Sequence, residues 1–392
     1  MLKRQKKLFL LSICMAAAAS GIFFATINNY LYEVYSVDAE GRGFLEFFRE
    51  MPGVLTVFFL AAIVAIREKY IMIAAAVLIA ASFVGMSSIP SEYIAVVMWI
   101  FIWSIGAHIN LSLQQSYGIA LSAVEGRGKF FGLVGGMRGA GRIVGVAVVW
   151  IGMGRLGLDF QHVFIVAAGF SLFAALGYSL LKPREHTARR RKRLVFRRRY
   201  SLFYLLAVLF GMRKQIFLVF APWVLVRIFE LTASRIAFLM FLAAAVGMFV
   251  KPVLGMCIDR FGERRMLMAD ACVLVLICAG YGLVPHYFVP EVAVPLLYGL
   301  YIMDDLLFSL RSAHTTYLSK ISKSHEDLTA TISMSFAIEH VVSMTGPILA
   351  GIIWMKFGFS WVFAMAGVVA VLMFIAATRI PSRRRLMEMP RA

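Results

Sequence analysis

Long runs of apolar residues extend along the whole chain and constrain its fold more than any other feature. A helix needs about 20 residues to cross the apolar core of a bilayer, and most of these runs are at least that long. Hydrophobic residues make up 61% of the 392 residues and charged residues 16%, which leaves too few polar side chains to cover a soluble globule. The sequence therefore predicts an all-α polytopic membrane protein, because the runs are too long for the strands of a membrane β-barrel.

The runs divide into twelve candidate transmembrane helices. We expect these spans at residues 8–32, 44–66, 70–89, 93–121, 126–153, 160–181, 201–226, 235–258, 265–285, 292–318, 327–355 and 358–379. The breaks between them carry charged residues, glycine or proline, as at residues 41–43 and at Pro285-His286. The first run is longer than the apolar core of a signal peptide, so we interpret it as a span.

The strongly basic balance of the chain is the second constraint. Forty Lys and Arg against 21 Asp and Glu give a net charge of +19. The basic residues gather in alternate loops, which predicts a protein of the cytoplasmic (inner) membrane with both termini in the cytoplasm. We expect these residues to set the orientation in the membrane, and we expect no nucleic-acid partner.

The longest polar interruption lies near the middle of the chain. It predicts a basic cytoplasmic linker over residues 183–200, between a six-helix half at 1–182 and a six-helix half at 201–392. The halves show weak internal similarity, since a shift of about 200 residues places Gln115-Ser116-Tyr117 over Thr315-Thr316-Tyr317. Two related six-helix halves are typical of secondary transporters, which bind their substrate near the middle of the membrane.

A short motif follows the eighth span. The chain has Gly255, then Asp259-Arg260, Gly262 and a pair of arginines. This pattern resembles the loop signature of the major facilitator superfamily (MFS), which implies twelve helices in two pseudo-symmetric halves. By that resemblance Asp259 and Arg260 are gating residues, and we expect Gly255 to let two helices approach closely. The loop at Arg67-Glu68-Lys69 lacks the corresponding glycine and aspartate.

Ionisable residues inside the spans are costly and usually face a cavity or a partner. In the resembled family, spans one, four, seven and ten line the central cavity. We therefore predict substrate-binding roles for polar residues of these spans, namely Asn28, His108, Gln114, Arg213, Lys214, Gln215 and Arg311. The hypothesis is that Arg213 or Lys214 neutralises an anionic group of the substrate. Lys251 and Asp270 lie near predicted span ends and receive little functional weight.

Buried carboxylates and histidines are candidates for proton coupling, because burial can raise the pKa of a carboxylate toward neutrality and histidine titrates near neutral pH. These candidates are Asp304, Asp305, Glu339 and His340. Glu46, Arg49 and Glu50 lie on one helix face and form either an outer gate or a fixed salt bridge. The alternative for every one of these residues is an internal ion pair that only holds helices together.

Glycines recur through the predicted fifth span. Gly132/Gly136 and Gly141/Gly145 have the spacing that permits close packing of membrane helices. Some branches of the resembled superfamily carry a Gly/Pro-rich fifth span that is associated with export. Here Arg142 stands where that proline is expected, so helix packing is the simpler interpretation.

These patterns favour a secondary active transporter that moves a small organic solute, with an anionic solute as one candidate, by alternating access. Coupling to protons or another ion is expected, because the sequence has no nucleotide-binding loop of the P-loop type. No enzyme motif, cofactor or metal-ligand spacing is found, and we expect a small-molecule substrate, a surrounding lipid bilayer and function as a monomer. An efflux pump for amphiphilic compounds and a transporter-like sensor without flux remain the alternatives.

Overall fold

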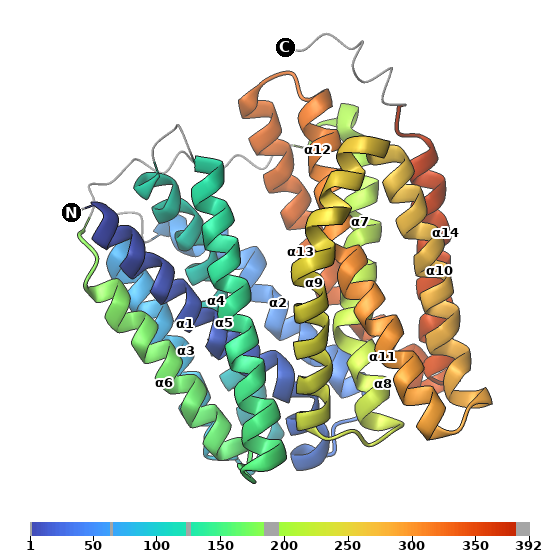
Figure 1. The fold of residues 1–392 in the computed structure, drawn as a ribbon, viewed down its shortest axis with the longest axis horizontal. Helices are drawn as coiled ribbons and strands as arrows, with labels where there is room; N and C mark the ends of the chain where they lie inside the picture. Colours follow the sequence, from blue (N-terminus) through green and yellow to red (C-terminus); the bar gives the residue numbers. More distant parts are fainter. Residues whose placement is uncertain (1, 63–65, 123–126, 184–195, 382–392) are drawn as a thin grey trace. The chain divides into compact units, whose positions relative to one another are not determined.

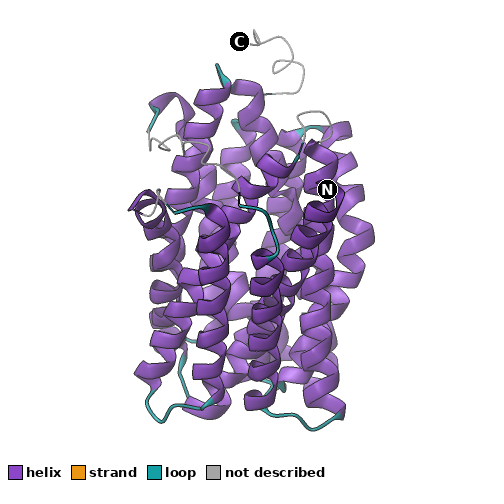
Figure 2. Ribbon diagram, turned by 90° about the vertical axis from the view of Figure 1, so that its left-hand side faces the viewer, coloured by secondary structure: helices purple, strands orange, loops and turns teal. Residues whose placement is uncertain are grey.

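A computed structural model describes residues 2–62, 66–122, 127–183 and 196–381 of the chain. All regular structure within these ranges is helical, as Figure 2 shows. Most of the predicted basic linker, residues 184–195, and the basic C-terminal residues 382–392 lie outside the described residues.

The first part of the chain forms the first six predicted spans (Figure 1). Their helices are α1 (Leu2–Asn29) with the π-helical turn η1 (Tyr30–Val34), α2 (Ala39–Ala62), α3 (Glu68–Ser87), α4 (Tyr93–Leu121), α5 (Arg127–Arg155) and α6 (Phe160–Ser179). Asp159 begins α6 by accepting a hydrogen bond from the backbone N–H of His162 at 3.0 Å. That bond holds the pKa of the exposed Asp159 carboxyl below its ordinary value.

The second part forms the other six, and two of these spans consist of several helical pieces. Span seven is η2 (Arg198–Tyr200), α7 (Ser201–Gln215), η3 (Ile216–Phe220) and α8 (Ala221–Arg227), and span ten is α11 (Pro290–Leu307), η4 (Phe308–Leu310) and α12 (Arg311–Ile321). The remaining spans are α9 (Ala233–Phe261), α10 (Glu263–Tyr287), α13 (His325–Phe357) and α14 (Phe359–Thr378).

Eleven helical segments of the described chain are long and apolar enough to cross a membrane. They match eleven of the twelve predicted spans, and the remaining one is α2. This helix has the necessary length but carries Glu46, Arg49 and Glu50 along its first half. With α2 included, the all-α fold with twelve spans is confirmed.

Two predicted breaks are wrong. Residues 41–43 lie inside α2, because Gly43 serves a close helix contact: a Cβ there would lie 2.2 Å from the carbonyl oxygen of Pro347 in α13. Pro285 lies inside the last turn of α10, which continues to Tyr287. A proline has no N–H to donate to the carbonyl four residues earlier, so α10 loses one backbone hydrogen bond there but continues for two more residues.

The described chain forms two compact units. The first comprises residues 1–36, 51–191 and 231–241, and the second comprises residues 37–50, 192–230 and 242–392. Each unit thus takes most of its residues from one half of the chain, but α2 and α9 each contribute to both units.

Close contact between α1 and α5 organises the first unit. A Cβ added at Gly141 would lie 2.0 Å from the carbonyl oxygen of Cys14, and one at Gly145 would lie 1.9 Å from that of Ala18. The predicted packing role of this glycine pair is therefore confirmed. The same prediction is wrong for Gly132 and Gly136, where an added Cβ would meet no described atom within 4 Å.

The first part of α9 completes this unit by packing against α5. Ser234 donates a hydrogen bond to the carbonyl oxygen of Trp150 at 2.9 Å. The indole of Trp150 also contacts the rings of Phe238 and Phe241, with centroid distances of 4.9 and 5.3 Å. This end of α9 is therefore attached to the first unit by both polar and aromatic contacts.

Aromatic packing joins the central helices of the second unit. Tyr281 of α10 stacks on Phe363 of α14 at 4.8 Å between centroids, and Phe217 of η3 contacts both rings. The first part of α2 packs against α13 in this unit, where a Cβ at Gly351 would lie 2.5 Å from the carbonyl oxygen of Ala39. These contacts position the ionisable residues of α7, α10 and α13.

Candidate functional site

A cavity of about 270 Å³ lies between α7, α12 and α13 of the second unit. Its wall has both polar and apolar side chains, and it includes two of the residues predicted from the sequence, Arg311 and Glu339. The other lining residues are Phe203, Ser312, His314, Thr315, Ile332, Ser335 and Phe336. The volume is close to the lower end of the roughly 300–1,000 Å³ found for ligand pockets, so it suits a small solute.

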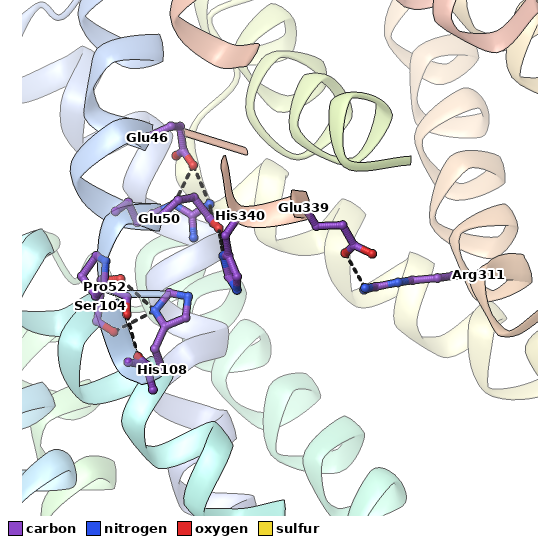
Figure 3. Close-up of polar contacts among 10 residues, drawn as sticks. Glu46, Glu50, Pro52, Ser104, His108, Arg311, Glu339 and His340 are labelled. Atoms are coloured by element: carbon purple, nitrogen blue, oxygen red, sulfur yellow. Dashed lines mark hydrogen bonds and ion pairs between the residues drawn. The ribbon is translucent and has the colours of Figure 1, made fainter. Parts of the chain in front are cut away.

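An ion pair between Arg311 and Glu339 forms one side of this cavity (Figure 3). The guanidinium of Arg311 also lies 5.7 Å from the ring centroid of Phe210 and 5.5 Å from that of Phe336. Ser335, one turn before Glu339 on α13, donates a hydrogen bond to its other carboxylate oxygen at 3.4 Å. The aromatic faces and the hydroxyl hold both charged groups in place at the cavity wall.

His314 is held rigidly at the same cavity. Its Nε2 donates to the carbonyl oxygen of Phe203 at 3.0 Å, and its ring stacks on that of Phe203 at 4.0 Å between centroids. With Nε2 occupied, this histidine is more suited to shaping the wall than to carrying a proton.

Arg213 of α7 lies fully buried between two carboxylates. It donates to both oxygens of Asp270 at 2.9 and 2.7 Å and to Asp304 at 3.0 Å. The prediction that Asp270 lies near the end of a span is wrong. Asp270 is fully buried, because α10 begins at Glu263 and carries this residue two turns inward. Such an arrangement favours a structural role for Arg213, since its charge is already balanced.

The neighbouring candidates have different surroundings. Lys251 donates to Asp305 at 2.7 Å, so these two half-exposed residues neutralise one another. Lys214 is half-buried and has no hydrogen-bond or ion-pair partner among the described residues. Gln215 is fully buried, and neither its amide nitrogen nor its amide oxygen has a partner in the described chain.

A network of charged residues joins the first part of α2 to α13. Glu46 binds Arg42 at 2.6 Å and Arg49 at 2.5 Å, and Arg49 also binds Glu50 at 2.6 Å. Glu50 in turn contacts Nδ1 of His340 at 2.9 Å. All of these residues except His340 are buried, so Arg42 is not the loop residue that the predicted span boundaries imply.

Glu339 and His340 are consecutive in sequence, but their side chains point in different directions (Figure 3). Glu339 faces Arg311 at the cavity, whereas His340 faces Glu50 of α2. Neighbours on a helix are about 100° apart, so one residue pair serves two separate clusters.

The motif begins in the last turns of α9, which carry Gly255, Asp259 and Arg260, and continues through a tight turn at Gly262. Gly262 has a φ of +83°, which glycine adopts without strain, and Glu263 begins α10. Asp259 and Arg260 are exposed, whereas Glu263 is buried and ion-paired with Lys320 of α12. A Cβ at Gly255 would meet no described atom within 4 Å, so the close-approach reason for this glycine is wrong. Sequence reasoning missed Glu263, although its place directly after a turn glycine was a usable signal.

The first unit holds the remaining candidates. Asn28 is buried in α1, and His108 contacts the hydroxyl and the carbonyl oxygen of Ser104 one turn earlier on α4 (Figure 3). Gln114 of α4 donates to the hydroxyl of Tyr178 at 2.9 Å and accepts from Arg138 of α5 at 3.0 Å. Arg138 is not among the site residues predicted from the sequence.

Comparison with known proteins agrees with this architecture. The family profile of the Major Facilitator Superfamily matches the chain over residues 8–310 and 203–390. The chain belongs to the Major Facilitator Superfamily. It is therefore a multi-pass membrane protein of a transporter family and not an enzyme. No curated protein matches the sequence significantly.

Solved structures of superfamily transporters share the fold. A mutant form of the nucleoside transporter NupG is 15% identical, with a TM-score of 0.78 over 96% of this chain and 99% of that one. A D-xylose-proton symporter is also 15% identical, with a TM-score of 0.74 over 96% and 97%. A bacterial homologue of the human lysosomal transporter Spinster, inward-facing and unoccupied, is 13% identical, with a TM-score of 0.70 over 97% and 96%. At these identities the similarity shows the fold alone.

Proposed function

We propose that this member of the superfamily is a secondary active transporter for a small organic solute, that it works by alternating access, and that it is coupled to protons. The observation that carries the proposal is the Arg311–Glu339 ion pair in the wall of the cavity between α7, α12 and α13. An ion pair that lines a cavity can open when a solute or a proton competes for one partner, whereas a fully enclosed pair cannot.

Glu339 is the proposed proton carrier. Its side chain is almost fully buried, yet it borders the cavity, and it has one cationic and one hydroxyl partner. Protonation of this carboxylate would release Arg311 for a solute, and loss of the proton would restore the pair. Asp304, Asp305 and His340 are the further proton-coupling candidates, and each already contacts a charged or ionisable partner.

Substrate contacts are proposed for residues that retain free bonding capacity and an unpaired charge or amide. Lys214 and Gln215 fit this requirement best in the second unit, whereas the charge of Arg213 is neutralised by Asp270 and Asp304. Asp259 and Arg260, in the last turn of α9, are proposed to act in gating. We further propose a monomer in the cytoplasmic membrane with both termini in the cytoplasm, as the distribution of basic loops favours.

Glu339→Gln is expected to uncouple transport from the proton gradient. The glutamine keeps the shape and accepts a hydrogen bond, but it cannot exchange a proton. In liposomes with an imposed pH gradient, accumulation of a solute from a mixed panel should fall to the level without a gradient, while solute exchange without a gradient continues.

Glu326→Gln is the matched control, because Glu326 is an exposed glutamate in the first turn of the same helix. It should leave accumulation unchanged. Gradient-driven accumulation that survives in Glu339→Gln would overturn the coupling role. Solute binding by the wild type without flux under any gradient would favour a sensor, and flux of amphiphilic compounds alone would favour an efflux pump.

A further inference from the structure

Two arginines lie one helical turn apart near the middle of α5. Arg138 and Arg142 are the twelfth and sixteenth residues of the helix Arg127–Arg155, about 16 and 22 Å along its axis at 1.5 Å per residue. Residues four apart share one face of a helix. Both guanidinium groups therefore belong to the same side of α5, deep within a membrane-spanning segment.

No carboxylate of the first unit is placed to neutralise them. The described acidic residues of this unit are Glu33, Glu68, Glu92 and Asp159, and all of them lie at or just beyond the end of a span. Within the part of the chain that the structure describes, neither arginine forms an ion pair. This pair thus adds two positive charges to the first unit without any compensation.

The second unit provides the contrast. Apart from its histidines, its ionisable residues in the middle of α7 to α13 are four basic and four acidic, namely Arg213, Lys214, Lys251, Arg311, Asp270, Asp304, Asp305 and Glu339. Three of the four basic residues are directly paired there. Charge within the membrane is therefore balanced in one unit and unbalanced in the other.

A neutral scaffold positions Arg138. Its Nη2 donates to Oε1 of Gln114 at 3.0 Å, and the amide nitrogen of Gln114 donates to the Tyr178 hydroxyl at 2.9 Å and to Oδ1 of Asn110 at 3.3 Å. Gln114, Asn110 and Tyr178 are all buried, so the scaffold is rigid. An amide orients the guanidinium without reducing its charge, whereas a carboxylate would cancel that charge.

Two unneutralised arginines at this depth cannot favourably face acyl chains, so they face water or an anion. Arg142 is exposed and Arg138 half-buried, which leaves guanidinium N–H groups open to such a ligand. Guanidinium groups bind carboxylate and phosphate oxygens through two parallel hydrogen bonds, and two of them suit a group or molecule with two negative charges.

We infer that Arg138 and Arg142 form an oxyanion-binding site, and that its ligand is a small organic solute carrying two carboxylates or a phosphate monoester. The inference rests on the proposed function only in taking this solute to be the transported one. It moves the anionic contact from Arg213 on α7 to the arginine pair on α5.

Ligand-induced thermal stabilisation tests the site without requiring flux. The purified full-length protein, in nanodiscs of phosphatidylcholine, is titrated with glutarate against dimethyl glutarate and with ribose 5-phosphate against ribose. At least one charged compound should raise the unfolding temperature, and its neutral counterpart should not. The Arg138→Gln/Arg142→Gln double variant should bind that compound at least ~100-fold more weakly. Each charge-assisted hydrogen bond that is lost weakens binding roughly tenfold or more, and the double variant loses at least two.

Arg155→Gln is the matched control, since Arg155 is an exposed arginine at the far end of the same helix. It should bind the compound like the wild type. Repeating the titration in nanodiscs that contain phosphatidylglycerol should leave the shift in place. Loss of the shift there would show that a lipid phosphate occupies the arginines, which would overturn the assignment to a solute.

Gln114→Glu provides a second test that retains both arginines. A carboxylate in place of the amide oxygen would pair with Arg138, as Glu339 pairs with Arg311. Anion binding should weaken about tenfold or more although the protein stays folded, because one positive charge is now compensated. Undiminished binding in Gln114→Glu would count against the charge argument.

Failure of this inference and failure of the proposed function give different results. Equal stabilisation by charged and neutral compounds, equal binding by the double variant and the wild type, or no shift with any charged compound would overturn the oxyanion site. A transporter of neutral solutes would still stand after each of these results. Arginine-dependent binding without flux would instead support the site and contradict the transport proposal.

Discussion

Gly145→Ala is expected to destabilise the protein by about 3 kcal/mol or more, the upper range for overpacking a close contact. The added methyl group would lie 1.9 Å from the carbonyl oxygen of Ala18 on α1 and 2.8 Å from its carbonyl carbon. These are backbone atoms, so no side-chain rotation relieves the overlap, and α1 must move away from α5. The measurement is the unfolding temperature of the purified protein in detergent, with the yield of folded protein as a second readout.

Gly136→Ala is the matched control on the same helix. An added Cβ there meets no described atom within 4 Å, so only helix propensity changes, and alanine is favoured over glycine by about 0.5–1 kcal/mol. The two substitutions are therefore expected to have opposite signs. Equal unfolding temperatures for both variants would refute the close α1–α5 contact.

Arg213→Met should cost about 3–5 kcal/mol, the range for breaking a buried ion pair by removing one partner. Methionine fills much of the same volume, but the fully buried Asp270 and the partly buried Asp304 then have no cation beside them. Thermal unfolding in detergent measures the effect. Adding Asp270→Asn to the same chain should recover part of the loss, since one unpaired charge is removed.

Lys214→Met separates structural from substrate-binding charge. Lys214 is the next residue of α7 and has no ion-pair partner in the described chain, so its replacement should change the unfolding free energy by about 0.5 kcal/mol or less. The substitution is expected to lower solute uptake by liposomes instead. If Lys214→Met unfolds as readily as Arg213→Met, the distinction drawn between the two neighbours is incorrect.

Helix α13 contributes to two separate clusters of charged residues, and this matters for the proposed proton coupling. Glu339 pairs with Arg311 of α12, while His340 contacts Glu50 of α2, and both contacts arise from consecutive residues of one helix. A rotation or shift of α13 would therefore disturb both clusters at once. In the proposed coupling, such a movement would let a proton on one cluster influence the other.

Helix positions were predictable because span length depends on the thickness of a bilayer, not on neighbouring helices. The ends were less accurate. Gly41, Gly43 and Pro285 predicted breaks between helices, but α2 continues through residues 41–43 and α10 continues past Pro285. A sequence pattern does not distinguish a glycine that ends a helix from one that admits a neighbouring backbone, as Gly43 does beside Pro347.

The candidate site was predictable by residue type but not by partner. Arg311 and Glu339 were both selected as ionisable residues within spans, and the structure brings them together. Asp270 received little weight because its depth was judged from an uncertain span boundary. Asp270 and Arg213 form the most buried ion pair among the described residues of their unit.

By itself, the sequence determined that this chain is an all-α membrane protein of twelve spans in a transporter superfamily, because apolar length and a loop motif are local properties. Only the tertiary structure decided which charges are neutralised. Pairing depends on which helix faces meet, and residues such as Arg213 and Asp270 are distant in sequence. The same geometry holds Arg138 by a neutral amide rather than a carboxylate, and this leaves the α5 arginines charged.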